Sequence, residues 1–200
     1  MKEKHLILGS ASPRRSDILK QVGIPFEIIP SLKEERITQK NPRKIVQELS
    51  LQKAMDVKEQ AIPLIDKEKD NYILCADTMI AYQSHIMGKP IDKEDAKRML
   101  MQLQGRKHYV YTGVTILSIK NGIENIRTFY ASTKVYMMQM NKDEIESYVN
   151  TGECLGKAGA YAIQGYGAKY IRKINGDYYN VCGLPMAKIY RKCKEEWMNI

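Results

Sequence analysis

The segment Leu6-Ile7-Leu8-Gly9-Ser10-Ala11-Ser12-Pro13-Arg14-Arg15 predicts a strand, a loop of small residues and the start of a helix. Leu6–Leu8 is a short apolar run of strand character, and the residues from about Ser16 to Val22 predict a helix. Phe26–Ile29 lies between two prolines and predicts a second strand. A chain that alternates strands and helices in this way is typical of an α/β protein.

A long amphipathic helix is expected to begin near Pro42, because proline suits the first helical turn. Val46, Leu49 and Val57 form its apolar stripe at helical spacing. Lys53 lies inside that stripe, four residues from both Leu49 and Val57. A lysine in such a stripe usually extends its ammonium group to water, and the alternative is a charge directed into a cleft.

The second half of the chain predicts two hairpins. Asn121-Gly122 and Asn175-Gly176 are strong turn signals between runs of strand residues. The expected strand pairs are His108–Ile119 with Ile126–Met138, and Tyr170–Ile174 with Tyr178–Val181. Further helices are expected after Asp92, from about Lys142 to Asn150, and after Pro185. Since hairpins require antiparallel strands, the sequence predicts an α/β fold with a mixed, twisted sheet and flanking helices.

A chain of 200 residues suits one domain over residues 1–200, or two small lobes that share a core. The early apolar run is too short for a signal peptide, and no stretch has the length of a membrane span. We therefore expect a soluble, cytoplasmic protein without a membrane partner. The four cysteines show no CxxC spacing, which favours reduced core residues over a zinc site or a disulfide framework.

The formal net charge of +9 favours an anionic partner. Basic residues are spread along the whole chain, without the arginine-rich arm or the interleaved aromatic pattern of a nucleic-acid reader. Charge alone thus favours phosphates without distinguishing a polymer from a small polyphosphate.

Two segments carry residues suited to phosphate chemistry. In Gly9–Arg15, small residues such as Ser10 allow close backbone approach, a helix N-terminus follows, and Arg14 and Arg15 can grip phosphate oxygens. An ordinary capped, solvated turn is an equally good interpretation of this segment alone. Asp77-Thr78 follows the apolar strand Tyr72–Ala76, where ligands often bind in α/β proteins, although a simple cap explains it as well.

Two glycine-containing segments complete the set of motifs. Gly88-Lys89-Pro90 is a stiffened loop with one lysine, and Gly156–Gly165 could pack closely around a ligand. Within the latter, Gln164 can both donate to and accept from a base edge. A glycine-rich turn beside a core strand is the plainer interpretation.

Taken together, these motifs resemble the Maf nucleotide pyrophosphatases, a family also described as septum formation inhibitors. The resemblance covers nearly the whole chain and is specific in the order and spacing of the motifs. Its motifs are Ser12-Pro13-Arg14-Arg15, Ala76-Asp77-Thr78, Gly88-Lys89-Pro90, Lys157-Ala158-Gly159-Ala160-Tyr161, Ile163-Gln164-Gly165, and Val181 with Gly183-Leu184-Pro185.

The resemblance implies a mixed α/β fold with a deep central cleft that hydrolyses nucleoside triphosphates to the monophosphate and pyrophosphate. It implies that Asp77 accepts a proton and that Glu34 and Asp77 hold a divalent metal (Mg²⁺, Mn²⁺ or Co²⁺). A homodimer is an alternative that the sequence leaves open. The residues implied to bind substrate are Ser10, Arg14, Arg15, Lys53, Thr78, Lys89 and Gln164. Gln164 in its Ile-Gln-Gly context resembles the branch that acts on dTTP and UTP.

The chain departs from the family pattern at Lys33 and Gly156, where relatives often carry acidic residues. Both departures remove negative charge near the implied metal. Two alternatives stay open: a nucleic-acid-binding or cell-division regulator, and an enzyme of the same chemistry whose substrate is a modified pyrimidine nucleotide. Glu34 and Asp77 argue against a stable nucleic-acid partner, because carboxylates repel a polyanion.

Overall fold

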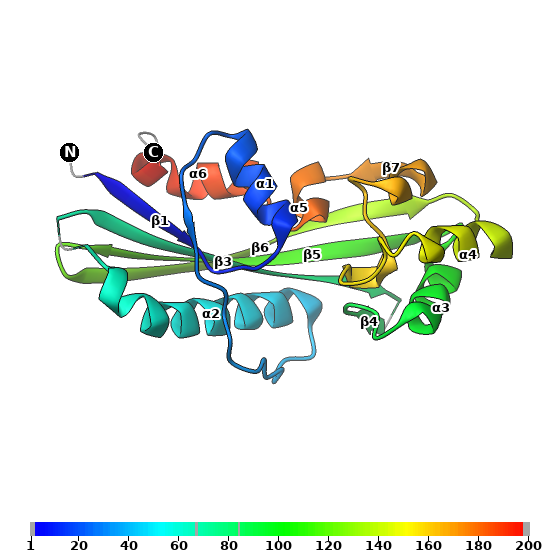
Figure 1. The fold of residues 1–200 in the computed structure, drawn as a ribbon, viewed down its shortest axis with the longest axis horizontal. Helices are drawn as coiled ribbons and strands as arrows, with labels where there is room; N and C mark the ends of the chain where they lie inside the picture. The colour runs from blue at the N-terminus through cyan, green and yellow to red at the C-terminus, as the bar shows by residue number, and fades with distance from the viewer. Residues whose placement is uncertain (1–2, 67, 84, 198–200) are drawn as a thin grey trace. The chain divides into compact units, whose positions relative to one another are not determined.

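The structure is a computed structural model that describes residues 3–66, 68–83 and 85–197 (Figure 1). In chain order its elements are β1 (Lys4–Leu8), α1 (Pro13–Gln21), β2 (Glu27–Ile28), α2 (Pro42–Ala61), η1 (Ile62–Leu64), β3 (Asp70–Tyr82), β4 (His85–Met87), α3 (Lys93–Leu103), β5 (Lys107–Lys120), β6 (Ile123–Met137), α4 (Lys142–Asn150), η2 (Ala158–Ala160), η3 (Tyr166–Tyr170), β7 (Ile171–Asn175), α5 (Tyr178–Cys182) and α6 (Met186–Trp197).

The strands form one mixed sheet in the order β2-β1-β3-β5-β6-β7, with β4 paired to β3. β1 runs parallel to β2 and β3, whereas β4 is antiparallel to β3 and β7 is antiparallel to β6. Helices flank this sheet, so the predicted α/β class with a mixed sheet is confirmed.

The chain divides into two compact units. Unit 1 takes in Met1–Asp77, Thr112–Ala131 and Gly183–Ile200, and unit 2 takes in Thr78–Tyr111 and Ser132–Cys182. The long strands β3, β5 and β6 therefore each contribute residues to both units.

In unit 1, α2 packs on one side of the sheet, while α1 and α6 lie on the other side (Figure 1). The predicted apolar stripe of α2 is confirmed, since Val46, Leu49 and Val57 are all buried. Val57 belongs to a core cluster with residues of β1, β3 and β5. Gly113 of β5 permits this packing, because a Cβ atom there would lie 1.9 Å from the carbonyl oxygen of Val46.

The core of unit 2 gathers α3 and α4 with β5 and β6 residues. It includes Leu100, Leu103, Val110, Val135, Met137, Ile145 and Val149. Within it, Nε2 of the buried His108 lies 2.8 Å from the hydroxyl of Tyr161. Burial lowers the pKa of His108 to about 4, so this imidazole is neutral at pH 7 and serves as a core hydrogen-bonding group.

The first predicted hairpin is confirmed. β5 and β6 are neighbours in the sheet and are joined by Asn121 and Gly122, whose φ angles of 49° and 78° are both positive. Positive φ at both central positions is what a type I′ turn needs. β6 begins at Ile123, three residues before the predicted start at Ile126.

The second predicted hairpin is wrong, because its second strand is the helix α5. Oδ1 of Asp177 accepts the N–H of Tyr179 at 2.8 Å, in the manner of a helix cap. The side chain of the buried Asn180 donates to the hydroxyl of Thr133 at 3.0 Å. These tertiary contacts favour a helix after the turn at Asn175-Gly176.

The predicted end of the third strand is also wrong, since β3 continues through Asp77 and Thr78 to Tyr82. β1 pairs with β3 only as far as Leu74, so Asp77 lies beyond the end of its parallel neighbour. Asp77 thus sits in the middle of a strand, at the level where the parallel pair β1 and β3 comes to an end.

The four cysteines are free and buried, as the sequence predicted. Burial raises the pKa of the Cys75 thiol to about 12, which makes it an unreactive core residue. Among the described residues, the structure contains no helix long and apolar enough to span a membrane.

Candidate active site

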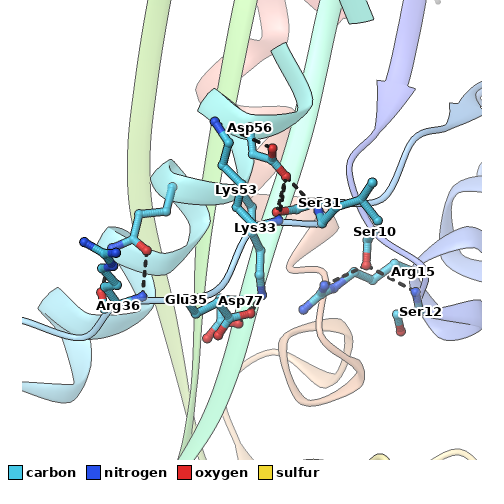
Figure 2. A network of polar contacts seen from close by, with 12 residues as sticks. Ser10, Ser12, Arg15, Ser31, Lys33, Glu35, Arg36, Lys53, Asp56 and Asp77 are labelled. Carbon is cyan, nitrogen blue, oxygen red and sulfur yellow. Dashed lines mark hydrogen bonds and ion pairs between the residues drawn. The ribbon is translucent and has the colours of Figure 1, made fainter. Parts of the chain in front are cut away.

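The charged centre of unit 1 is formed by Lys53, Asp77 and Glu35 (Figure 2). The ammonium nitrogen of Lys53 lies 2.5 Å from Oδ1 of Asp77 and 2.8 Å from Oε1 of Glu35. The side chains of Lys53 and Asp77 are only 16% and 13% exposed, whereas that of Glu35 is 45% exposed. Two carboxylates therefore share one ammonium group, and one of them is largely shielded from water whereas the other is partly exposed.

The helical register of α2 places Lys53 at this centre. Lys53 follows Leu49 by one turn, so its stem leaves the face of the helix that packs on the sheet. Of the two interpretations left open by the sequence, the lysine that extends into water does not hold, because its ammonium group meets carboxylates instead.

Arg15, in the first turn of α1, also belongs to unit 1. Arg15 donates from Nη1 to the hydroxyl of Ser10 at 2.8 Å and from Nε to the carbonyl oxygen of Gly183 at 2.9 Å. Burial lowers the pKa of Arg15 below its ordinary value, while the nearby Asp77 carboxylate acts in the opposite direction. Ser10 and Arg15 are thus fixed by each other, and Arg15 shares an electrostatic environment with Asp77.

The smallest residue of the loop between β1 and α1 has a packing role. A Cβ atom at Gly9 would lie 2.1 Å from the sulfur of Cys75, and the N–H of Gly9 donates to the carbonyl oxygen of Leu74 at 2.8 Å. Gly9 lets the loop leave β1 tightly against β3, which is sufficient reason for a glycine here. Arg14 is half-buried in the first turn of α1, next to Arg15.

The segment after β2 carries the two consecutive glutamates. Glu34, predicted as a metal ligand, is exposed, and its neighbour Glu35 is the one that contacts Lys53. Sequence reasoning missed Glu35, although the Glu34-Glu35 pair offered the signal that either carboxylate could face the site. The side chain of Lys33 turns to α2, where its ammonium lies 2.5 Å from Oε2 of Glu59, so it adds no direct contact at Asp77.

Three predicted site residues belong to unit 2. Thr78 follows Asp77 directly in β3 and is half-buried. Lys89 lies in the loop after β4, where the carbonyl oxygen of Gly88 accepts the N–H of Gly159 at 2.9 Å. That bond brings together two of the motifs, Gly88-Lys89-Pro90 and the segment that ends in Gly159-Ala160-Tyr161.

Gln164 is exposed in a loop that a single carboxylate holds. Glu153 accepts the N–H groups of Tyr166 at 2.8 Å and Gly167 at 2.9 Å. A Cβ atom at Gly165 would lie 1.8 Å from Oε1 of Glu153, so glycine is required for this contact. The loop presents Gln164 outward on an ordered backbone.

The implied divalent metal can be tested against the side chains at hand. In the part of the chain that the structure describes, no group of three or more His, Cys, Asp or Glu side chains is arranged to hold a metal ion. Mg²⁺ commonly takes one or two protein carboxylates and completes its shell with water and substrate phosphates. Asp77 and Glu35, whose carboxylates share the ammonium group of Lys53, offer such a donor set, and hard carboxylate oxygens also suit Mn²⁺.

Gly156, the second position at which the chain departs from the family pattern, is explained by its backbone conformation. Gly156 adopts a φ of 71°, in the left-handed region that favours glycine. A side chain such as that of aspartate would be strained in this backbone conformation.

Comparison with known proteins covers almost the entire chain. The family model for Maf-like proteins matches residues 5–196. A dTTP/UTP pyrophosphatase from Agathobacter rectalis is 44% identical over 198 residues, which cover 95% of this chain and 96% of the relative. A protein of the same name from Bacillus cereus is 44% identical over 193 residues, covering 96% and 95% of the two chains.

More distant similarities run over the same length. A dTTP/UTP pyrophosphatase from Caldanaerobacter subterraneus is 40% identical over 196 residues, covering 96% of this chain and 89% of the relative. Among solved structures, a HAM1 protein from Coxiella burnetii covers 96% of this chain with a TM-score of 0.46 and 13% identity, a likeness too distant to bear on function. The family model and the full-length relatives agree with the motifs of the sequence, and this chain belongs to the Maf-like protein family.

Proposed function

We propose that this chain hydrolyses nucleoside triphosphates, with dTTP and UTP as substrates, to the nucleoside monophosphate and pyrophosphate. The observation that carries the proposal is the carboxylate of Asp77, oriented by the ammonium group of Lys53 at 2.5 Å and set in the electrostatic environment of Arg15. The names of relatives that are 40–44% identical over nearly the full length support this choice of reaction and substrates.

In the proposed reaction, a water oxygen attacks the α-phosphorus and the bond from that phosphorus to the bridging oxygen of the β-phosphate breaks. Pyrophosphate leaves, and Asp77 accepts the proton that the water loses. Lys53 fixes the direction of the Asp77 carboxylate, so that the base is held ready before the substrate arrives.

The cationic side chains bind and neutralise the triphosphate in this account. Lys53 and Arg15 lie in the environment of Asp77, and we assign the same task to Arg14 and Lys89. A bound Mg²⁺, Mn²⁺ or Co²⁺, held by Asp77 with Glu34 or Glu35, would supply further neutralisation of phosphate charge.

A substrate panel tests the proposal. The purified chain is incubated with dTTP, UTP, CTP, ATP and GTP, each with Mg²⁺, Mn²⁺ or Co²⁺ and in a chelator, and released pyrophosphate is measured. We expect dTTP and UTP to be the best substrates and the chelator to abolish turnover. Absence of pyrophosphate release from every nucleotide with every metal would overturn the proposal.

Gln164→Ala is expected to erode the preference for UTP over CTP more than it lowers the maximal rate. Uracil and thymine present a carbonyl–NH–carbonyl edge that one side-chain amide can pair at two points, whereas cytosine leaves a donor or acceptor mismatched. Once the bound base shields this amide from water, an unpaired polar group costs about 1–3 kcal/mol, which corresponds to roughly 10- to 100-fold discrimination. The ratio of kcat/KM for UTP and CTP measures the effect.

Gln139→Ala is the matched control, because Gln139 is another exposed glutamine of unit 2. Its UTP/CTP ratio should equal that of the unmodified chain. If Gln164→Ala keeps this ratio too, Gln164 does not read the base.

A further inference from the structure

The segment that carries the glutamate pair is bonded along one ridge of α2. Glu48, Gln52 and Asp56 follow one another at intervals of four residues, so their side chains lie on the same side of the helix. Each of the three accepts a backbone N–H from residues 32–38. We call this set the α2 ladder.

The strongest anchor of the ladder is Asp56. Its Oδ2 accepts the N–H of Leu32 at 2.7 Å and the N–H of Lys33 at 3.2 Å, and it also accepts the hydroxyl of Ser31 at 2.8 Å (Figure 2). Asp56 is only 5% exposed. A buried carboxylate that gathers several donors fixes their position, because moving any of them away leaves charge without a partner.

Gln52 and Glu48 of the ladder hold the end of the segment that follows Glu34 and Glu35. The side-chain amide of Gln52 accepts the N–H of Arg36 at 3.0 Å and donates to the carbonyl oxygen of Arg36 at 2.6 Å. Oε2 of Glu48 accepts the N–H of Thr38 at 3.0 Å. The anchors therefore fall at residues 31–33 and 36–38, with Glu34 and Glu35 between them.

We propose that Asp56 is a positioning residue: with Gln52 and Glu48 it fixes the backbone on both sides of Glu34 and Glu35 and so holds the carboxylate of Glu35 at the pair formed by Lys53 and Asp77. The inference rests on the proposed function for its catalytic consequence. It follows from geometry alone that the pair cannot shift along α2 without breaking backbone bonds on one side or the other.

The electrostatics of Asp56 agree with a constant anchor. Burial by itself would raise the pKa of this carboxyl, but the bonds from Leu32, Ser31 and Lys33 lower it further than burial raises it. The pKa of Asp56 therefore lies below its ordinary value, and the carboxylate is ionised throughout the neutral range.

Asp56→Ala is expected to lower kcat/KM for dTTP by roughly 10- to 100-fold, the usual effect of losing a group that orients residues at a metal site. The concentration of Mg²⁺ needed for half-maximal activity should rise by a similar factor, because Glu35 is no longer held near Asp77. Asp56→Asn keeps an oxygen acceptor, so it should change both kcat/KM and the Mg²⁺ requirement by smaller factors. A purely structural role would lower stability without changing the Mg²⁺ requirement of the folded fraction.

Glu59→Gln is the matched control. Glu59 lies on the same helix and contacts the same segment, but only through the exposed side chain of Lys33. Its variant should keep the activity and the Mg²⁺ requirement of the unmodified chain.

Trypsin provides a readout that does not depend on activity. Lys33 and Arg36 lie within the anchored segment, and a protease needs this backbone to leave the helix before it can cut. Without metal or nucleotide, Asp56→Ala should be cut after Lys33 and Arg36 at least about 10-fold faster than the unmodified chain, and Glu59→Gln should not. Mass spectrometry of early fragments identifies the cuts, and circular dichroism verifies that each variant is folded.

The outcomes separate the two proposals. Unchanged trypsin cleavage in folded Asp56→Ala would show that the ladder does not hold the segment. Faster cleavage with unchanged kcat/KM and Mg²⁺ requirement would overturn the positioning role. If the unmodified chain itself hydrolyses no nucleotide, the proposed function fails, and the cleavage rates alone decide whether the ladder holds the segment.

Discussion

Asp77→Asn is expected to leave a folded protein whose kcat is about 10²–10⁴ lower, the range associated with the loss of a general base. The substitution keeps the size of the side chain, and its amide oxygen can still accept from Lys53. It removes the negative charge and the ability to take a proton from water. Initial rates of pyrophosphate release under saturating dTTP measure kcat, and the thermal midpoint verifies that the fold is kept.

The control for this variant comes from the same strand. Asp70→Asn changes a half-buried aspartate at the start of β3, seven residues before Asp77. It should retain the turnover of the unmodified chain. Turnover of Asp77→Asn that equals that of Asp70→Asn would remove Asp77 from the mechanism.

Lys53→Met is expected to have the second largest effect, with kcat/KM lowered by roughly 10²–10³, as for the loss of one preorganised electrostatic contact. Methionine preserves the packing of the stem against α2 and the sheet, but leaves the carboxylates of Asp77 and Glu35 without their shared ammonium group. The free energy of unfolding should fall by about 1–3 kcal/mol, less than for a fully buried pair because both partners keep some contact with water. Chemical denaturation and steady-state kinetics measure the two effects.

Lys58→Met separates the site from ordinary surface charge. Lys58 lies five residues later on α2 and makes an ion pair with Glu124 at 2.7 Å, and both of these side chains are more exposed than those of Lys53 and Asp77. Its loss should change neither kcat/KM nor stability appreciably. If Lys53→Met behaves like Lys58→Met, the cluster around Asp77 is a surface ion pair without a catalytic part.

Local patterns predicted much of the fold. The apolar stripe of α2 and the Asn121-Gly122 turn depend on neighbours within one or two turns of the chain, so the sequence alone sufficed. The predicted strand at Tyr178 and the predicted strand end at Asp77 were wrong because contacts with residues elsewhere in the fold decide these structures. A helix replaces the expected strand at Tyr178 because the backbone of Asp177 and the side chain of Asn180 both bond to Thr133. β3 runs past Asp77 because β4 pairs with its residues Ile80–Tyr82.

The site was predictable in its residue types and only partly in its contacts. The position of Lys53 in an apolar stripe indicated an inward charge, but nothing in the local pattern identified Asp77, 24 residues away, as its partner. Glu35 escaped prediction because the choice between two adjacent glutamates depends on how α2 anchors the backbone around them. Arg15 bonds to Gly183, 168 residues later in the chain, a contact that only the folded chain reveals.

The most direct test of the central claim is hydrolysis of dTTP in water enriched in ¹⁸O, followed by mass spectrometry of both products. Attack of water on the α-phosphorus, with Asp77 as proton acceptor, predicts one ¹⁸O atom in dTMP and none in the released pyrophosphate. Label in the pyrophosphate would place the attack on the β-phosphorus, and dTDP with labelled orthophosphate would place it on the γ-phosphorus. Either of these results would contradict the account.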